Sequence, residues 1–216
     1  YYEHILDLSG GTGEIYSRFR ESTKRNIKKA RKAGVEVEFT RSPDSMKEFY
    51  RLNCLTRKMH GLPPQPFTFF KNVHEYIILK NNGLLAIARY GDKAIASSIY
   101  FHFGRKAIYK YGASDREFQG LRANNLVMWK AIEWYCRNGY SSFSFGRTDA
   151  EHEGLRQFKS GWGAEERTIN YFRYDTQKKK IIKNKPGVSG VHNYLFQKMP
   201  VRILRIIGEV LYRHVG

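Results

Sequence analysis

Cysteine, acidic side chains and long apolar runs are all scarce in this chain. Only Cys54 and Cys136 occur among 216 residues, and we expect both to be buried, reduced thiols. This scarcity excludes a disulfide framework, and the seven scattered histidines predict no metal site. No window reaches the ~20 apolar residues of a membrane span, and no signal peptide opens the chain. We therefore expect a cytoplasmic location, with membrane contact only at the periphery.

Basic residues far outnumber acidic ones. The 38 Lys and Arg stand against 20 Asp and Glu, which gives a formal net charge of +18. An excess of this size predicts a polyanionic partner, such as RNA, an anionic membrane surface or a phosphorylated ligand. The 15 Tyr and 14 Phe suit a core built on a β-sheet.

The order of the predicted elements is that of an α+β domain with one central mixed sheet flanked by helices. Three strands, a long helix and a fourth strand are predicted over 84–90, 95–103, 106–112, 121–138 and 140–145. The unit 106–145 should be a parallel crossover. A basic helix is expected over 14–32 and a last strand over 168–174.

Three parts are expected along the chain. Residues 1–34 form a lead-in segment and a basic linker helix, 35–177 the α+β domain, and 178–216 a basic linker with C-terminal helices. This tail is amphipathic and broken at Pro200. Because the sequence begins at Tyr1 rather than Met, we expect a fragment of a longer protein.

The segment from Phe145 to Gly163 carries the clearest chemical signal. A strand ends at Gly146-Arg147, a polar loop follows, and a short helix carries Phe158-Lys159 just before a Trp-Gly turn. Glycines let the backbone and a lysine approach a ligand closely, and such a lysine can stabilise a developing oxyanion or bind an anionic acyl donor. A solvated lysine on an ordinary strand–turn–helix is the alternative.

Four segments resemble those of a known family in their amino-acid sequence and in their order along the chain. They are Lys24–Val35, Gly61–Pro64 with Phe69-Phe70, Asn124–Ile132, and Phe145–Gly163. The chain resembles the Gcn5-related N-acyltransferase (GNAT) fold, and more closely the second GNAT-like half of the Fem-type peptidoglycan-bridge aminoacyltransferases. The resemblance implies that 35–177 is a GNAT-like acyltransferase domain. It also implies that an upstream GNAT-like half is missing.

The resemblance further implies attack of an amine on an activated acyl carbonyl, with no enzyme nucleophile. By this resemblance Phe158 positions the donor and Lys159 stabilises the oxyanion. Arg147 is expected to hold a carboxylate or phosphate, with a structural salt bridge as the alternative. Asp149 is a candidate to relay a proton through water. No resident cofactor is expected, and the co-substrate is aminoacyl-tRNA or acyl-CoA.

The residues of segment 117–122 bear on whether the acyl donor is acyl-CoA or aminoacyl-tRNA. Members that use acetyl-CoA typically present a cation and small residues here, whereas this chain has Glu117 in place of the cation and Arg122 in place of a small residue. Arg116 and Arg122 compensate in part for the repulsion between Glu117 and a pyrophosphate. This departure favours aminoacyl-tRNA. The other residues expected to bind substrate or donor are Gly120, Asn125 and Trp162.

The basic helix is the expected contact for tRNA. Its candidate residues are Lys24, Arg25, Lys28, Lys29, Arg31 and Lys32. Such a track suits phosphate contacts that position a nucleic acid without reading its sequence. A solvated charged face is the alternative, and the amphipathic tail 200–213 is the better candidate for an anionic membrane.

Three functions remain open from the sequence. The first is transfer of an aminoacyl or acyl group to an amine of a cell-wall or surface-polysaccharide precursor. The second is an acyl-CoA-dependent N-acyltransferase acting on an amino sugar. The third is a non-catalytic RNA- or membrane-binding domain on the same fold.

Overall fold

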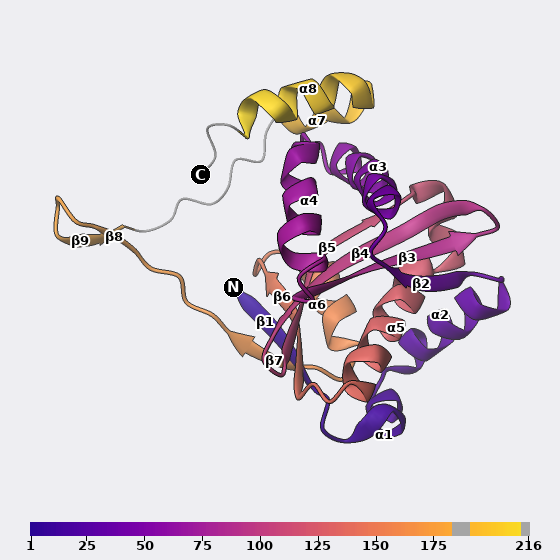
Figure 1. The fold of residues 1–216 in the computed structure, drawn as a ribbon. Coiled ribbons are helices and arrows are strands. Elements are labelled where there is room, and N and C mark those ends of the chain that lie inside the picture. The colour runs from indigo at the N-terminus through magenta and orange to yellow at the C-terminus, as the bar shows by residue number, and fades with distance from the viewer. Residues whose placement is uncertain (183–190, 213–216) are drawn as a thin grey trace.

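A seven-stranded mixed sheet forms the centre of the fold (Figure 1), as the sequence predicts. The structure, a computed structural model, describes residues 1–182 and 191–212. The strand order is β2-β3-β4-β5-β6-β1-β7, and every pair is antiparallel except β5–β6. The strands are β1 (Tyr2–Asp7), β2 (Glu36–Thr40), β3 (Gly83–Tyr90), β4 (Lys93–Phe103), β5 (Lys106–Ser114), β6 (Ser142–Thr148) and β7 (Glu165–Thr168).

Helices cover the sheet on two sides. One layer contains α1 (Gly11–Ser17), α2 (Glu21–Lys32), α5 (Ala123–Arg137) and α6 (Glu153–Ser160), and a 3-10 turn, Arg116–Leu121, leads into α5. The other contains α3 (Pro43–Met59), α4 (Phe67–Val73) with a π-helical turn at His74–Ile78, α7 (Val191–Lys198) and α8 (Val201–Leu211). Because neighbouring residues of β3 point to opposite faces, Ala86 and Ala88 join the core under α5, while Leu85 and Ile87 join the core under α3.

The first 34 residues belong to this domain, which differs from the predicted boundary. Strand β1 lies inside the sheet between β6 and β7, and α2 packs along α5. Leu6 and Leu8 are buried with Ile15 and Ile27 in the core under α5. A lead-in segment could not be separated without opening the sheet.

The predicted helix over 14–32 is two helices, because tertiary contacts break it at residues 18–20. The backbone N–H of Arg20 and the hydroxyl of Thr23 both donate to the carbonyl oxygen of Gly161, at 3.0 Å each. Phe19 turns inward between Trp129 and Trp162. The break therefore fixes α2 against the end of α6.

The C-terminal region also differs in part from the prediction. The strand expected over 168–174 is divided between β7 and β8 (Arg173–Asp175), which pairs with β9 (Lys180–Ile182) in a hairpin that extends from the body (Figure 1). The predicted helical tail is present and breaks at Pro200. The rest of the predicted basic linker, residues 183–190, and the end of the tail, residues 213–216, lie outside the described residues.

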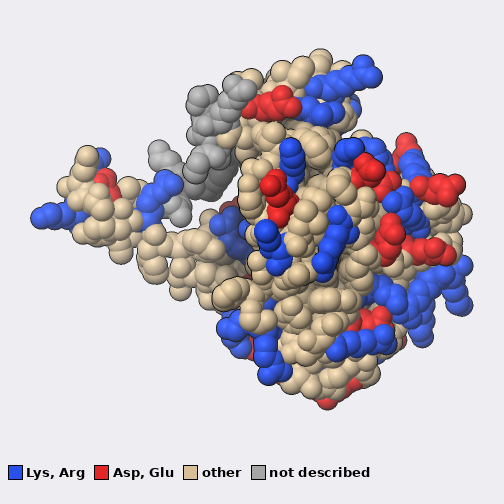
Figure 2. All heavy atoms as spheres, in the orientation of Figure 1, with Lys and Arg blue, Asp and Glu red and all other residues tan. Residues whose placement is uncertain are grey.

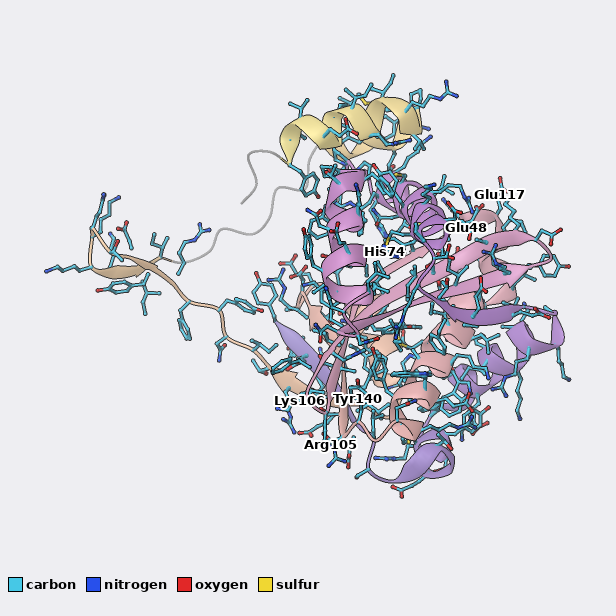
Figure 3. The ribbon with its side chains drawn as sticks, viewed as in Figure 1. Glu48, His74, Arg105, Lys106, Glu117 and Tyr140 are labelled. Atoms are coloured by element: carbon cyan, nitrogen blue, oxygen red, sulfur yellow. The ribbon has the colours of Figure 1, made fainter. Side chains whose placement is uncertain are left out.

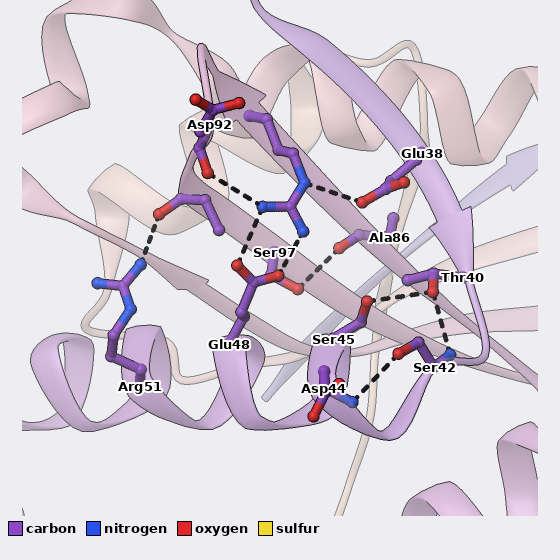
Figure 4. Close-up of polar contacts among 12 residues, drawn as sticks. Glu38, Thr40, Ser42, Asp44, Ser45, Glu48, Arg51, Ala86, Asp92 and Ser97 are labelled. Atoms are coloured by element: carbon purple, nitrogen blue, oxygen red, sulfur yellow. Dashed lines mark hydrogen bonds and ion pairs between the residues drawn. The ribbon is translucent and has the colours of Figure 1, made fainter.

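Arg89, near the end of β3, connects β2 and α3 to the sheet (Figure 4). Its guanidinium donates to both carboxylate oxygens of Glu48 on α3, at 3.0 and 2.5 Å, and to Glu38 on β2 at 3.0 Å. Hydrogen bonding to Glu48, and to a smaller extent to Glu38, raises the pKa of Arg89 above its ordinary value. The bidentate contact is the stronger of the two, because both of its bonds are charge-assisted and nearly parallel.

We expect Glu48→Ala to lower the free energy of unfolding by about 1–2 kcal/mol, since it removes a partly buried bidentate partner. Glu38→Ala should lower it by about 0.5 kcal/mol or less, because its single contact is at the surface. Urea unfolding of both variants measures the difference. Equal losses would contradict a dominant Arg89–Glu48 contact.

Candidate active site

Strands β5 and β6 run parallel but pair over only three residues each, 106–108 with 142–144. Beyond that point β5 bulges at Lys110, where its register against β4 shifts, and β6 bulges at Phe145 and Gly146 against β1. Gly146 has a φ of +69°, and a Cβ there would lie 3.2 Å from the carbonyl oxygen of Tyr109. The two strands therefore separate beyond residues 108 and 144. Figure 3 labels Lys106, at the start of β5, and Glu117, just beyond the end of β5.

Lys159, in the last turn of α6, lies at this separation. Its side chain is buried, with 3% of the residue exposed. The ammonium donates to the carbonyl oxygens of Gly146 at 2.8 Å and Arg147 at 3.1 Å, both on β6. The amine is thus anchored where β6 leaves β5, and a solvated surface lysine does not describe it.

Burial lowers the pKa of Lys159 from 10.5 to about 8, while the carboxylates of Glu3 and Asp149 oppose the shift. At neutral pH the side chain is therefore mostly charged. Two of its three hydrogens are used by backbone carbonyls, which leaves one for a ligand. A fixed cation in a poorly solvated site acts more strongly on a developing negative charge than a cation in water.

Lys159 lines one of two neighbouring cavities. The Lys159 pocket, about 660 Å³, is lined by Lys159 together with Glu3, Tyr109, Arg147 and Tyr171 among others. At its edge the guanidinium of Arg147 lies over the ring of Tyr1 at 4.2 Å and that of Tyr171 at 5.3 Å. These contacts hold an exposed cation beside aromatic surfaces, and the salt bridge considered for Arg147 is not among the ion pairs of the described residues.

The second cavity, the helix pocket, lies at the start of α5 and measures about 290 Å³. It brings together three residues predicted from the sequence, Arg122, Asn125 and Phe158. Tyr109 lines both cavities, and Phe158 and Lys159 are consecutive, so the two cavities adjoin at the end of α6. Arg122 is in the left-handed conformation at the N-terminus of α5, where backbone N–H groups favour an anion.

The structure does not bring every predicted residue to these cavities. Arg116 and Gly120 are exposed on the 3-10 turn and line neither of them. Asp149 lies in an exposed loop 3.9 Å from His152 and reaches Lys159 only through its charge. Trp162 is fully buried between Phe19 and Phe145, so the structure gives it a packing role instead of direct contact with a donor.

Strand β1 supplies residues that the sequence did not single out. Ser144 donates to the carboxylate of Glu3 at 2.7 Å, which fixes Glu3 beside the Lys159 pocket. His4 is fully buried, and burial lowers its pKa although the nearby Glu166 carboxylate opposes the shift. Its Nε2 lies 3.2 Å from Glu166 without the alignment of a hydrogen bond. The sequence indicated a short strand or an extended segment over residues 3–8. No local pattern showed that this strand inserts beside β6.

The surroundings of Glu117, in segment 117–122, differ from the expectation. Glu117 does not face a ligand unpaired, because Lys93 lies 3.7 Å from it and 3.5 Å from Asp115. Lys93 also lies over the ring of Phe118. The acidic residue is thus partly neutralised by a neighbouring strand.

The basic residues of α2 form a surface of their own. Arg25, Lys28, Lys29, Arg31 and Lys32 are exposed, and Lys24 is half-buried and paired with Glu21 at 2.9 Å. Lys and Arg side chains gather on the side of the molecule where α2 lies (Figure 2). Through Thr23 and Gly161 this helix contacts the end of α6, so the basic surface adjoins the element that carries Lys159.

Lys159 should make stability depend on pH in a definite window. Its folded-state pKa lies below its unfolded value, so between pH 8 and 10.5 the unfolded chain binds more protons and the free energy of unfolding rises with pH. The rise totals about 3 kcal/mol, at about 1.4 kcal/mol for each pKa unit.

Lys159→Met removes this titration while keeping a side chain of similar length. Urea unfolding at several pH values should show the difference between wild type and variant changing across the window. A difference that stays constant from pH 8 to 10.5 would contradict a buried, charged amine.

Relatives of known name match parts of the chain. The lipid II:glycine glycyltransferases of Staphylococcus saprophyticus and Staphylococcus aureus are 29% and 31% identical to it over 75 residues. That segment is 32% of this chain and 18% of those proteins, so the chain spans much less than their full length.

Solved structures share the fold. The crystal structure of FemX matches 76% of this chain and 59% of its own length, with a TM-score of 0.70 and 16% identity. L-PGS from Bacillus licheniformis matches 76% of this chain and 57% of its own length, with a TM-score of 0.55 and 13% identity. At these identities the likeness concerns the fold alone.

A family model matches a longer part of the chain than the 75 residues shared with these glycyltransferases. The acetyltransferase (GNAT) domain matches residues 17–166, which include α2, the sheet from β2 to β6, and α6 with Lys159. The match begins well before residue 35, in agreement with the single domain seen in the structure. The chain therefore belongs to the GNAT acetyltransferase domain family and has the fold of the Fem-type structures.

Proposed function

We propose that this domain transfers an aminoacyl group from aminoacyl-tRNA to an amine of a lipid-linked cell-wall precursor. The observation that carries the proposal is the buried, charged Lys159, held by two backbone carbonyls in a cavity that shares Tyr109 with the helix pocket. The similarity to the staphylococcal glycyltransferases, whose names give lipid II as a substrate, supports the choice of acceptor.

In the proposed step the acceptor nitrogen, as a neutral amine, attacks the ester carbonyl of the donor. A C–N bond forms, the C–O bond to the tRNA ribose breaks, and the proton of the amine passes to the released oxygen. The remaining N–H of Lys159 donates a hydrogen bond to the carbonyl oxygen as negative charge develops there. Phe158, which lines the helix pocket, positions the acyl group.

Opposite sides of the strand separation suit the two substrates. The donor occupies the helix pocket at the start of α5, and the acceptor approaches the other face of the sheet where β1 and β6 line a hollow. That face carries a hollow of about 940 Å³, which shares Glu3 and Ile108 with the Lys159 pocket. Its mixed lining, including Asp7, Arg18 and Arg167, suits a polar acceptor.

The basic surface of α2 favours tRNA over acyl-CoA as the donor. Its exposed cations lie on one helix and adjoin α6. Arg147 with Tyr1 and Tyr171 adds a cation and aromatic faces at the edge of the Lys159 pocket, a combination suited to phosphate and nucleobase. Transfer from acyl-CoA to an amino sugar is the second candidate. It is favoured by the anion-binding start of α5 and by the pairing of Glu117 with Lys93.

The proposed setting is the cytoplasmic side of a membrane, with peripheral contact. No helix in residues 1–182 and 191–212 is long and apolar enough to cross a bilayer. A lipid-linked acceptor would require the domain to work at the bilayer surface.

Lys159→Met in the full-length protein should lower kcat about 100-fold, the cost of losing one oxyanion donor, with little change in KM. Lys130→Met, which removes a surface lysine paired with Glu133, is the matched control and should change neither. Because Lys159 loses its charge near pH 8, wild-type kcat should fall above that pH, whereas the residual rate of Lys159→Met should not. A wild-type kcat that rises through pH 9 would contradict the assigned role.

Lys28→Glu combined with Lys29→Glu should weaken binding of charged tRNA at low salt. It should also reduce the slope of log K against log salt by roughly 1 to 2, about 0.9 for each phosphate that the protein no longer neutralises. Filter binding with Lys47→Glu and Lys71→Glu, exposed lysines on the α3–α4 side, provides the control.

Saturable acetyl-CoA binding without tRNA preference would support the second candidate, and salt-sensitive tRNA binding without transfer would indicate a non-catalytic binding domain.

A further inference from the structure

Helix α8 presents three distinct faces. Leu204 and Gly208 are buried against the body of the domain. Arg202, Arg205 and Glu209 follow at helical spacing on a second, polar face. Ile203, Ile206 and Val210 form a third face, and they are 46%, 63% and 55% exposed. We call these three residues the α8 apolar stripe.

Contacts with α3 and the loop after it hold the stripe outward. A Cβ at Gly208 would overlap the carbonyl oxygen of Pro64, so the helix lies directly on the backbone of that loop. Arg57 of α3 donates to the hydroxyl of Tyr212 at 2.9 Å, and Gln197 of α7 donates to the carbonyl of Met59 at 3.1 Å. The stripe is therefore an exposed apolar surface on a docked helix.

Cations lie beside the stripe on one side. Arg202 and Arg205 lie on the adjacent face of α8, and Lys198 lies at the end of α7. Neither arginine takes part in the ion pairs found among residues 1–182 and 191–212, and Arg205 lies over the ring of Tyr50 at 5.2 Å. Glu209 is the single acidic residue within α8. The surface thus combines isolated positive charges with exposed branched side chains.

We propose that the α8 apolar stripe docks on the surface of an anionic phospholipid bilayer. Amphipathic helices that lie in the bilayer interface bury an apolar face at the acyl-chain boundary and place Arg and Lys beside the headgroups. The charge complementarity selects this occupant, because a second copy of the chain would bring the same arginines into repulsion. The proposal deepens the peripheral membrane contact proposed above by naming its surface and its lipid class, and it does not require transfer activity.

The position of α8 leaves the basic surface of α2 free. Helices α7 and α8 lie outside α3 on one side of the sheet, whereas α2 packs on α5 on the other side (Figure 1). A domain docked through α8 therefore turns α2 away from the bilayer. One molecule could then hold a membrane and a polyanion in solution on opposite faces.

The test is sedimentation of the full-length protein with vesicles of phosphatidylcholine alone or mixed with phosphatidylglycerol. We expect binding to the mixed vesicles. The triple variant Ile203→Ser, Ile206→Ser, Val210→Ser should bind at least about tenfold more weakly. Phe103→Ser, which removes an apolar side chain that is 88% exposed at the end of β4, should change binding less than twofold.

Salt and α2 variants separate insertion from charge attraction alone. In the wild type part of the binding should persist at high salt, whereas this part should disappear in the triple variant. Lys28→Glu with Lys29→Glu should leave it unchanged. Vesicle binding that is equal in wild type and triple variant would overturn the proposal. So would a dimer, seen by sedimentation velocity without vesicles, that the triple variant dissociates.

Transfer to a water-soluble acceptor analogue distinguishes this inference from the proposed function. The triple variant should retain that activity at the wild-type level. Lost vesicle binding with intact transfer supports the docking surface. Normal vesicle binding in a protein that transfers nothing would refute the proposed function without affecting the docking surface.

Discussion

Parallel pairing between β5 and β6 ends after three residue pairs, and the candidate site depends on this limit. A bulge in each strand bends it away from the other, and Gly146 provides the left-handed conformation that the bulge in β6 needs. The separation allows the backbone at Gly146 and Arg147 to receive the ammonium of Lys159. Without it the sheet would close, and the Lys159 pocket would lose the wall that β6 provides.

The hydrogen bonds of Lys159 anchor a buried cation and also orient its ammonium. Its burial is unfavourable for a cation, and the carbonyls of Gly146 and Arg147 offset part of that cost. The same burial removes competing water from the place where negative charge would develop. Stability is thus reduced at the position where a charged, oriented amine is useful, as is common for functional sites.

The sequence predicted the sheet, the β5–α5–β6 crossover and the break at Pro200, since each depends on local patterns. It did not predict the insertion of β1, because pairing with β6 and β7 is set by partners far along the chain. Trp162 was expected at the donor and lies in the core, because a tryptophan beside a glycine is compatible with a ligand pocket and with a core. The helix break at residues 18–20 was also invisible, since it arises from the carbonyl of Gly161.

The place of β1 has a consequence for biosynthesis. Its partners β6 and β7 are synthesised almost at the end of the domain. On the ribosome β1 therefore has no strand to pair with while β3, β4 and β5 are already emerging. During that interval a strand with unpaired backbone groups is open to association with other chains. The Lys159 pocket, walled partly by Glu3, would be the last feature of the nascent domain to mature.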